Sequence, residues 1–358
     1  MSPTSVHAGS SDPRPLLEVE GLSVTFTIAG VPYRAVDNLS LAIAVQEAVG
    51  LVGESGSGKS VTARSILGLT ETRHIASGAI RFAGTDLVSL GEAGWRRLRG
   101  REITLIPQNA LASMNPVFSV GWQIAELFRV HDGASRRDAR QRTIDVMERV
   151  GIPGASRRFD SYPHEFSGGM RQRAMIAMAV ALNPKLVIAD EPTTALDVTM
   201  EAQIIDLLED LRRDTGMALV HITHDVDLVA STVDRLVVMY AGRIVESGPA
   251  DQVYQRPAHP YTKALLGSRP SLGERQQAAL QTIPGAPPKI TAIPSGCAFH
   301  PRCPLRRKEC DTVRPELRKI SNDRVVACHA AEEMLGIEPA PVDAAGGEPV
   351  TSAPGAVG

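Results

Sequence analysis

Short apolar runs alternate with longer helix-like patterns through most of the chain, from residue 17 to about 246. Residues 48–52 and 186–189 are continuously apolar, as expected of strands buried on both faces, whereas 200–213 carry apolar residues at helical spacing. This alternation predicts an α/β layer of strands and crossover helices. Because ligands of such sheets gather at the carboxyl ends of strands, the polar residues that follow the two strands are the first candidates for a site.

Two other regions depart from this alternation. Between about 109 and 183 the strand signals fade and 135–150 is amphipathic, which predicts an inserted helical subdomain. Past residue 248 Pro, His and Gln become frequent, which predicts a small irregular domain. The C-terminal end of the chain has too few large side chains to bury the apolar surface that folding requires. We therefore expect a disordered N-terminus at 1–15, an α/β domain at 16–256, a C-terminal domain at 257–335 and a disordered tail at 336–358.

Composition and charge narrow the classes of function that this chain can have. The chain has 358 residues, 43% hydrophobic and 22% charged, which is typical of a globular protein of about two domains. A formal charge of −2 provides no net basic field for nucleic acid, and we interpret the short run Arg96, Arg97, Arg99 and Arg101 as a solvated helix face. The apolar runs are shorter than the roughly 18 residues of a spanning helix, and the N-terminus lacks the pattern of a secretory signal. We expect a cytosolic location and no nucleic-acid partner.

A glycine-rich run follows the first buried strand. The sequence Gly53-Glu-Ser-Gly-Ser-Gly-Lys59-Ser60 precedes a helix-like segment, which is the context of a phosphate loop. Glycines let backbone N–H groups turn toward a β-phosphate, while Lys59 reaches the β and γ oxygens and Ser60 ligates Mg²⁺. A Gly/Ser-rich connecting loop is the alternative, but the pattern arises by chance in on the order of one chain in a hundred. The predicted nucleotide ligands are Gly53, Ser55, Gly56, Ser57, Gly58, Lys59, Ser60 and Val61.

Two carboxylates end the second buried strand. Asp190 is predicted to hold Mg²⁺ through water, and Glu191 to polarise or deprotonate the attacking water. An acidic pair at a helix N-terminus is the structural alternative. Beside a phosphate loop, the pair predicts a nucleoside triphosphatase.

The segment Phe166-Ser-Gly-Gly-Met-Arg-Gln172 stands before the second strand and directly precedes an apolar, helix-like run. It resembles the signature motif of ATP-binding cassette (ABC) proteins. The resemblance implies an ATPase with a RecA-like phosphate-loop fold that works as a head-to-tail dimer. In such a dimer the signature residues bind the γ-phosphate of ATP held by the partner, and these residues are Ser167, Gly168, Gly169 and Met170.

The other motifs of that family follow in the expected order. Gln108 stands as the Q-loop residue, with a role in catalysis and in binding Mg²⁺, residues 194–197 as the D-loop ending in Asp197, and His224 as the switch histidine. A lone Gln or His is more often structural, and the order of the motifs is what favours the functional interpretation. His221 lies nearby, but His224 has the flanking residues that the family pattern requires. An aromatic side chain is expected to stack on adenine, and of Tyr33 and Phe26 we favour Tyr33.

Three segments resemble one branch of that family, the oligopeptide/dipeptide importer ATPases. They are Ser-Gly-Gly-Met-Arg-Gln-Arg at 167–173, Ser-Met-Asn-Pro-Val-Phe-Ser-Val at 113–120 and Pro-Ala-His-Pro-Tyr-Thr-Lys-Ala-Leu-Leu at 257–266. Phe166 replaces the usual Leu and is expected to alter only packing. The resemblance covers about 17–330.

This resemblance implies an ATP-hydrolysing importer subunit for oligopeptides or dipeptides, peripheral on the cytoplasmic face of the inner membrane. Its implied partners are two integral-membrane permease subunits, a second ABC ATPase in a heterodimer and an extracytoplasmic solute-binding protein. Residues 109–123 are expected to form the groove for a permease coupling helix. The alternatives are an importer of nickel or another small solute, and a non-transport ABC ATPase acting on ribosomes or DNA.

All four cysteines fall in the predicted C-terminal domain. Cys297, Cys303, Cys310 and Cys328 are separated by five, six and seventeen residues, without the paired knuckles of most structural zinc sites. Such clustering in a reducing compartment suggests an Fe–S cluster or zinc rather than disulfides, with incidental thiols as the alternative. The importer resemblance implies a structural [4Fe–4S] cluster; Zn²⁺ is the second option, for which His300 and His329 are substitute ligands.

Overall fold

The computed structural model describes residues 14–70, 74–193, 197–267 and 283–337. Its largest sheet has the strand order β11-β12-β10-β9-β3-β8-β7-β6. The strands from β9 to β6 are parallel, and each of the inner ones is flanked on both sides. The bounds are β3 (Ala48–Val52), β6 (Ile103–Ile106), β7 (Leu186–Asp190), β8 (Ala218–Thr223) and β9 (Arg235–Tyr240). All residues of β3, β7 and β8 are buried, which explains the continuously apolar runs at 48–52 and 186–189.

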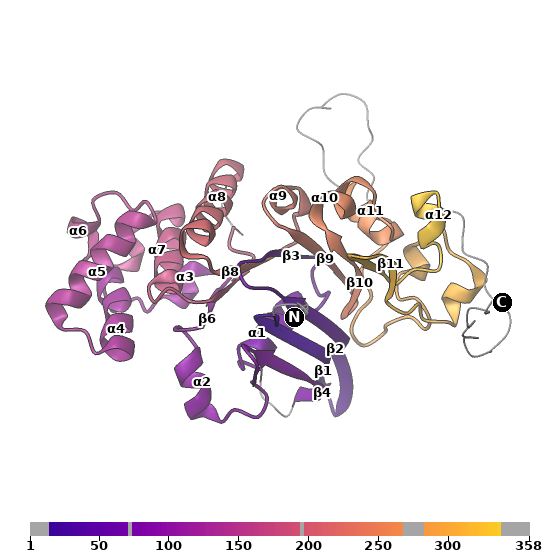
Figure 1. The fold of residues 1–358 in the computed structure, drawn as a ribbon, viewed down its shortest axis with the longest axis horizontal. Coiled ribbons are helices and arrows are strands. Elements are labelled where there is room, and N and C mark those ends of the chain that lie inside the picture. Colours follow the sequence, from indigo (N-terminus) through magenta and orange to yellow (C-terminus); the bar gives the residue numbers. More distant parts are fainter. Residues whose placement is uncertain (1–13, 71–73, 194–196, 268–282, 338–358) are drawn as a thin grey trace, which may run out of the picture.

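A second, antiparallel sheet of order β2-β1-β4-β5 lies below the main sheet, on the same side as α1 (Lys59–Ile66) (Figure 1). Its inward side chains share one buried cluster with the main sheet, for example Leu17 and Ile80 with Leu51. The hydrophobic pattern did not distinguish the two sheets, because strands of both are apolar where they face this core. The bounds are β1 (Leu17–Ile28), β2 (Val31–Ile43), β4 (Ile75–Phe82) and β5 (Thr85–Asp86), and α2 (Glu92–Leu98) follows.

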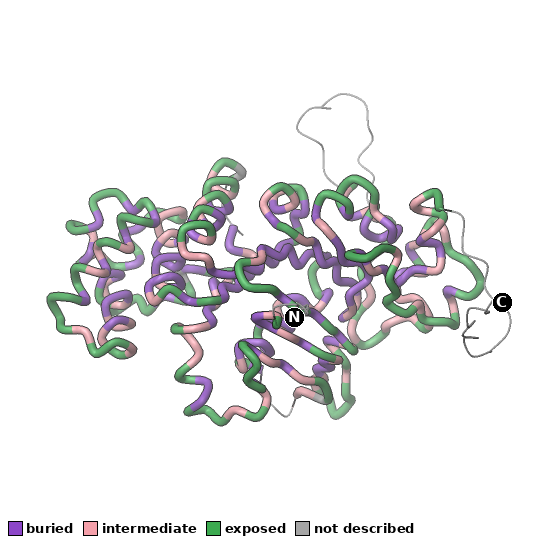
Figure 2. The backbone as a smooth tube through the Cα atoms, in the orientation of Figure 1, coloured by how far each residue is buried: buried purple, intermediate pink, exposed green. Residues whose placement is uncertain are grey.

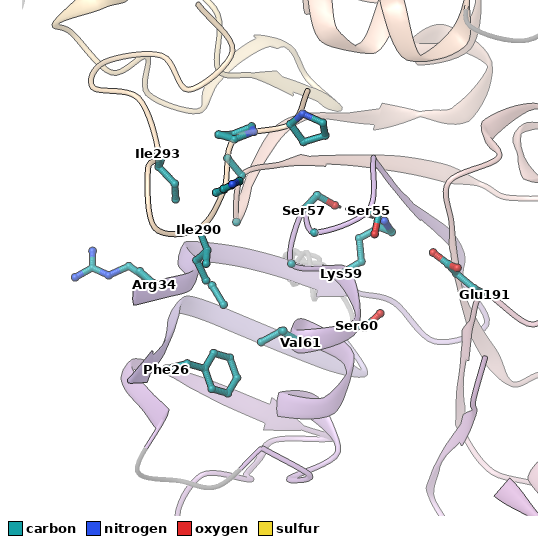
Figure 3. A pocket seen from close by; sticks show the side chains of 18 of the residues that line it. Phe26, Arg34, Ser55, Ser57, Lys59, Ser60, Val61, Glu191, Ile290 and Ile293 are labelled. Carbon is teal, nitrogen blue, oxygen red and sulfur yellow. Dashed lines mark hydrogen bonds between the residues drawn. The ribbon is translucent and has the colours of Figure 1, made fainter. Parts of the chain in front are cut away.

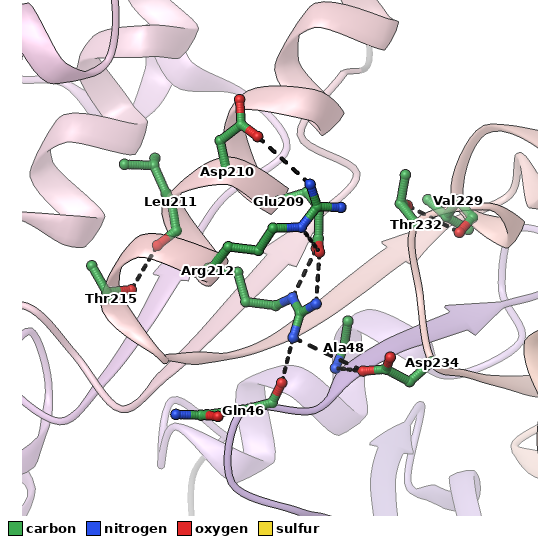
Figure 4. Close-up of polar contacts among 11 residues, drawn as sticks. Gln46, Ala48, Glu209, Asp210, Leu211, Arg212, Thr215, Val229, Thr232 and Asp234 are labelled. Atoms are coloured by element: carbon green, nitrogen blue, oxygen red, sulfur yellow. Dashed lines mark hydrogen bonds and ion pairs between the residues drawn. The ribbon is translucent and has the colours of Figure 1, made fainter.

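Helices α8 (Val198–Thr215) and α9 (Val226–Ala230) cover the opposite face of the main sheet, whose strands are buried in the middle of the molecule (Figures 1 and 2). The C-terminal end of α8 is fixed to the chain entering β3. Arg212 donates to both carboxylate oxygens of Glu209 at 2.8 and 2.6 Å and to the carbonyl of Gln46 (Figure 4). This network holds the start of the strand that leads into the glycine-rich loop.

The described residues between 110 and 180 are mainly helical and lie at one end of the molecule in Figure 1, where α7 adjoins α8 and the main sheet. Ser119 and Ser135 cap two of them by accepting hydrogen bonds from Trp122 and Asp138 N–H groups. Phe128 and Phe166 are buried between the helices. The bounds are α3 (Ala110–Ser113), α4 (Val120–Asp132), α5 (Arg136–Arg149), α6 (Ala155–Arg158) and α7 (Gly168–Val180), with a 3₁₀ turn η2 (Pro163–Glu165).

The C-terminal region continues the main sheet. Strand β12 (Arg324–Val326) pairs antiparallel with β10 (Arg243–Pro249), a contact that the sequence did not predict. The fully buried Glu246 accepts hydrogen bonds from Arg324 and from the N–H groups of Ala258 and His259. The other elements are α10 (Ala250–Gln255), α11 (Pro260–Leu266), η3 (His300–Arg302), η4 (Lys308–Asp311), β11 (Arg318–Ser321) and α12 (Ala331–Leu335).

The two ends that we expected to be disordered lie outside the described residues, except for 14–15 and 336–337. Within the described ranges, the helices are too short or too polar to span a membrane. The arginine run is not uniformly solvated: Arg96 is exposed, but Arg99 donates to the carbonyls of Leu67 and Gly68, just past the end of α1.

Candidate nucleotide-binding site

The glycine-rich run is a loop between β3 and α1, so the strand, loop and helix are arranged as expected. Gly53, Gly56 and Gly58 have φ angles of 153°, 79° and 103°, which side-chain-bearing residues rarely adopt. A Cβ atom at Gly53 would also lie 2.3 Å from the carbonyl oxygen of Met239. The glycines are therefore required by the backbone path itself, which turns the loop over the N-terminus of α1.

Lys59 is buried against this loop. Its Nζ donates to the carbonyls of Gly53 at 2.7 Å and Glu54 at 3.0 Å. Burial lowers the pKa of Lys59, while the nearby charges of Glu191 and Asp190 oppose that shift. A buried ammonium group at a helix N-terminus has the chemistry needed to hold a polyphosphate.

Ser60 and Asp190 meet at the carboxyl end of β7. The hydroxyl of Ser60 donates to Asp190 Oδ1 at 2.9 Å, although the two residues are 130 positions apart. Burial raises the pKa of Asp190, and the hydrogen bond from Ser60 opposes this rise. A hydroxyl and a carboxylate in contact are suitable ligands for magnesium, directly or through water.

The three predicted catalytic residues lie together, with Gln108 and His224 both close to the carboxylate of Glu191. Gln108 Nε2 donates to Glu191 Oε2 at 2.8 Å, and Nδ1 of His224 lies 3.6 Å from Oε1. The backbone of Glu191 has φ 48°, in the left-handed region, and its N–H donates to the carbonyl of Ile222 at 2.8 Å. The arrangement brings together residues from β7, from the end of β8 and from the segment after β6, around one carboxylate.

His221 differs from His224 in its surroundings. It lies in the middle of β8, is 1% exposed, and neither ring nitrogen has a hydrogen-bond partner among the described residues. Burial lowers its pKa to about 4, so the ring stays neutral near neutral pH. His224, at the end of the strand and exposed, is the histidine that reaches Glu191.

The loop lines a cavity of about 580 Å³ together with Gln108 and Glu191 (Figure 3). Phe26 is part of its wall, whereas Tyr33, which we favoured as the adenine-stacking residue, is not. The two residues are cross-strand partners in β1 and β2, and a register shift between Val24 and Thr25 precedes them. Direct cross-strand partners lie next to one another, so the sequence pattern did not distinguish which of the two aromatic side chains lines the cavity.

The sequence analysis missed a second wall of this cavity. It comes from the segment at 287–293, more than 200 positions beyond the loop, which we had assigned to a separate domain. Ile290 lies near Val61, on the same side of the cavity as Arg34 (Figure 3). No motif marked this segment. Its lining residues are Pro287, Pro288, Lys289, Ile290 and Ile293.

The signature segment does not line this cavity. Ser167 caps α7 by accepting a hydrogen bond from Met170 N–H at 3.3 Å, and Gly168 begins the exposed first turn. Phe166 is 2% exposed within the helical cluster. Residues 194–196 of the D-loop lie outside the described residues, and Asp197 caps α8.

The four cysteines are free thiols in the C-terminal region. Sγ of Cys310 and of Cys328 each accept a backbone hydrogen bond, at 3.4 and 3.3 Å. Burial, and then the other three cysteines, raise the pKa of Cys328 to about 12. His300 and His329 contact backbone carbonyls. Within the described residues, no group of three His, Cys, Asp or Glu side chains is arranged to hold a metal ion.

Comparisons with known proteins agree with this site. The sequence pattern of the ABC transporter family matches residues 36–194, and that of the oligopeptide/dipeptide transporter C-terminal region matches 245–310. A putative peptide import ATP-binding protein of Brucella ovis is 45% identical over 333 residues, 90% of this chain and 98% of that protein. The dipeptide transport ATP-binding protein DppD of Escherichia coli K12 is 46% identical over 315 residues, 88% of this chain and 96% of that protein.

Solved structures show the same fold. A dimeric ATP-binding cassette in a post-hydrolysis state, bound to ADP and phosphate, has a TM-score of 0.60 at 24% identity. That similarity covers 65% of this chain and 98% of the other. The protein cbiO1 from Clostridium perfringens, part of the ABC transporter complex cbiONQ, has a TM-score of 0.59 at 25% identity, with 68% and 92% covered.

The fold and the site define an ATP-hydrolysing cassette, as the α/β pattern and the motif order predicted. The chain belongs to the ATP-binding cassette transporter family, in the branch that carries the oligopeptide/dipeptide transporter C-terminal region.

Proposed function

We propose that this chain is the ATP-hydrolysing subunit of an importer of oligopeptides or dipeptides. The observation that carries the ATPase assignment is the convergence of Gln108 and His224 on Glu191, beside the Ser60–Asp190 pair. The peptide cargo is supported by the C-terminal family region and by the names of the relatives. This assignment divides the chain into a nucleotide-binding domain at 16–256, with its helical subdomain at about 109–183, and a C-terminal domain at 257–335.

In this proposal the triphosphate lies over the loop 53–60, with the adenine ring against Phe26. Ser60, Gln108 and Asp190 would hold Mg²⁺, which neutralises phosphate charge when bound with the nucleotide. Glu191 accepts a proton from the attacking water, and Gln108 orients its carboxylate by donating to Oε2. His224 lies close enough to Glu191 to contact the γ-phosphate region from the other side.

The exposed signature residues serve a second cassette. Ser167, Gly168, Gly169 and Met170 lie at the start of α7, where the first N–H groups of a helix have no partner within it. The Met170 N–H donates to Ser167 Oγ, and we propose that the N–H groups of Gly168 and Gly169 bind the phosphate of a partner's ATP. We propose a heterodimer with a related ATPase, in which Asp197 lies near the shared interface. Closure on two ATP molecules then drives the transport cycle.

One of the two permease subunits would dock on the helical subdomain of this chain. Val117, Phe118 and Trp122 are exposed there, and the rings of Phe118 and Trp122 stack at 4.2 Å. Gln123 fixes the preceding loop by hydrogen bonds to the backbone of Asn115 and Phe118. A rigid apolar surface of this kind is suited to a permease coupling helix. Docking places the chain peripherally on the cytoplasmic face of the inner membrane, and a solute-binding protein outside supplies the cargo.

We also propose that Cys297, Cys303, Cys310 and Cys328 hold a structural [4Fe–4S] cluster, with Zn²⁺ as the alternative. The donor set supports this, because four thiols share one short region and backbone N–H groups donate to two of their sulfur atoms. A bound metal would add cross-links between the four cysteine positions of this region.

The test is to identify what binds the closed state. A tagged Glu191→Gln chain, held in ATP and Mg²⁺, is purified from detergent-solubilised membranes, and its partners are identified by mass spectrometry, with Lys59→Ala as the matched control. Two polytopic subunits and a second cassette, enriched over the control, are the expected result. The accompanying binding protein is then screened with peptides and with nickel. Ribosomal or DNA-repair proteins in place of permeases would overturn the transport assignment while leaving the ATPase intact.

A further inference from the structure

We propose that Arg302, in the C-terminal region, is a positioning residue of the nucleotide site: it neutralises the Glu54 carboxylate of the phosphate loop, so that the loop accepts a polyphosphate. The inference rests on the proposed location of ATP at residues 53–60, and it assigns the C-terminal region a direct part in ATP binding.

The two side chains form a two-pronged ion pair across 248 positions of sequence. Nη1 of Arg302 lies 2.7 Å from Glu54 Oε2, and Nη2 lies 2.9 Å from Oε1. The Arg302 side chain is 6% exposed, and it makes two further hydrogen bonds: Nε donates to the carbonyl of Pro284 at 2.8 Å and Nη1 to the hydroxyl of Tyr240 at 3.3 Å. The guanidinium group is thus fixed in place, which makes this pair different from a mobile surface salt bridge.

The backbone of Glu54 is also held by the C-terminal region. Its N–H donates to the hydroxyl of Tyr261 at 2.8 Å, and Tyr261 is fully buried at the start of α11. The carbonyl of Glu54 accepts hydrogen bonds from Lys59 Nζ at 3.0 Å and from Ser57 N–H at 3.2 Å. The second residue of the loop is therefore tied to the C-terminal region by its side chain and its backbone, and to Lys59 by its carbonyl.

Electrostatics explains why the loop needs this cation. A carboxylate next to the phosphate-binding N–H groups repels a triphosphate, and Glu54 lies close enough to Lys59 for its charge to oppose the lowering of the Lys59 pKa by burial. In the proposed complex Lys59 would bind the phosphates, so it would not balance Glu54 as well. The Glu54 carboxylate raises the pKa of Arg302, as expected for a strong pair. With Arg302 present the pair is neutral, and the field of the loop and of α1 remains positive toward the ligand.

The pair also links the cysteine-bearing turn to the loop. Arg302 is the last residue of η3 and directly precedes Cys303. A shift of this turn would move the guanidinium group away from Glu54, so nucleotide binding would depend on the conformation of the C-terminal region.

The experiment measures the ATP dissociation constant and the steady-state kcat and KM of the full-length chain. Arg302→Met is expected to weaken ATP binding and raise KM about 10-fold, because it leaves Glu54 charged and unpaired in a partly buried site. Adding Glu54→Gln to Arg302→Met removes the uncompensated charge, and we expect the double variant to bind ATP within about twofold of the unmodified chain. Arg302→Lys keeps the charge but loses the two-pronged geometry of the guanidinium group, so its ATP affinity should lie between those of Arg302→Met and the double variant.

Two controls separate the outcomes. Arg318→Met removes an ion pair with Glu332 in the same region, 2.6 Å in length and away from the loop, and should leave ATP affinity unchanged. Unmodified affinity in Arg302→Met, or equally weak binding in Arg302→Met with and without Glu54→Gln, would overturn the proposal. Lys59→Ala addresses the proposed site itself: if that variant binds ATP normally, the location of the nucleotide is wrong, whatever Arg302 does.

Discussion

Glu191 occupies an unfavourable backbone conformation for a residue with a side chain, at φ 48°. Such strain costs on the order of 1–3 kcal/mol and persists where the surrounding structure fixes it. Here the N–H of Glu191 is bonded to β8, and Gln108 holds its carboxylate. The strain therefore serves to place one carboxylate at the end of β7, facing the loop.

Substitution of Lys59 is expected to weaken ATP binding, whereas substitution of Glu191 is expected to slow ATP turnover. Lys59→Ala removes the buried cation of the loop, so ATP affinity should fall at least about 10-fold. Glu191→Gln keeps the hydrogen-bonding shape but cannot accept a proton, so ATP should still bind while kcat falls at least about 100-fold. Equilibrium binding and single-turnover hydrolysis distinguish the two effects. Near-normal turnover by Glu191→Gln would show that another group is the base.

His221 makes folding stability depend on pH. Its pKa is lowered from 6.5 to about 4 in the folded protein by burial. Between these values the unfolded chain binds the proton and the folded chain does not, so stability falls as pH decreases from 6.5 and the loss is complete below about 4. The full effect is about 3 kcal/mol. Burial lowers the pKa of His259 as well, to about 3, and this acts in the same direction.

We expect His221→Gln to flatten the dependence of the free energy of unfolding on pH between 6.5 and 4.5. Denaturant titrations at several pH values measure the slope, which does not depend on whether the substitution itself costs stability at neutral pH. Identical slopes in the two chains would mean that the buried ring is protonated in the folded protein.

At the scale of elements, the loop between α3 and α4 presents an apolar surface outside the nucleotide site. Phe118 and Trp122 are each 40% exposed and stack on one another, and Ser119 caps α4 between them. The buried cluster beneath these helices continues into the main sheet and α8, for example from Phe128 to Val187 and Leu208, so this surface is carried by a helical layer that is packed on the cassette core.

Trp122→Ala tests this surface. The side chain is partly solvated, so we expect the free energy of unfolding to change by less than about 1 kcal/mol, whereas co-purification with the permease subunits and transport should fall at least about 10-fold. ATP binding by the isolated chain should stay the same, because Trp122 does not line the cavity. Val130→Ala, at another exposed position of α4, is the matched control. Undiminished assembly of the Trp122 variant would place permease docking elsewhere.

At the scale of the whole molecule, the C-terminal region is joined to the cassette rather than appended to it. Strand β12 extends the main sheet, residues 287–293 line the nucleotide cavity, and Arg302 reaches the phosphate loop. Gly296 shows how closely the cysteine segment is packed: at φ 63°, a Cβ atom there would lie 2.4 Å from the carbonyl oxygen of Cys310. We therefore expect changes in this region to affect the nucleotide site.

Metal analysis tests the proposed cluster. Chain purified without oxygen is expected to contain about four iron and four sulfide per molecule, with a visible absorption band that bleaches on reduction. Cys303→Ser should lose most of the iron, and Ser295→Ala, beside the same segment, should retain it. Zinc at one equivalent per chain would replace the cluster assignment with the alternative, and the absence of both metals from anaerobic protein would contradict it. A large loss of ATPase on reduction of an intact cluster would contradict a purely structural role.

The sequence alone determined the class of fold, the ATPase motifs and their order. Buried strands need continuous apolar runs, and a phosphate loop needs glycines where Gly53 and Gly58 have positive φ, so both requirements act on neighbouring residues and leave a local pattern. The same locality explains why His224 could be preferred over His221 from its flanking residues. Helical periodicity likewise marked the segment that contains α5.

Only the tertiary structure decided which distant residues complete the site. Phe26 rather than Tyr33 lines the cavity, and the second wall and Arg302 come from a region that the composition suggested was separate. No spacing rule connects Glu54 with a partner 248 positions away. Contacts of this kind arise when β12 pairs with β10 and brings the C-terminal region over the loop, and that pairing depends on the packing of the whole sheet, which no local pattern records.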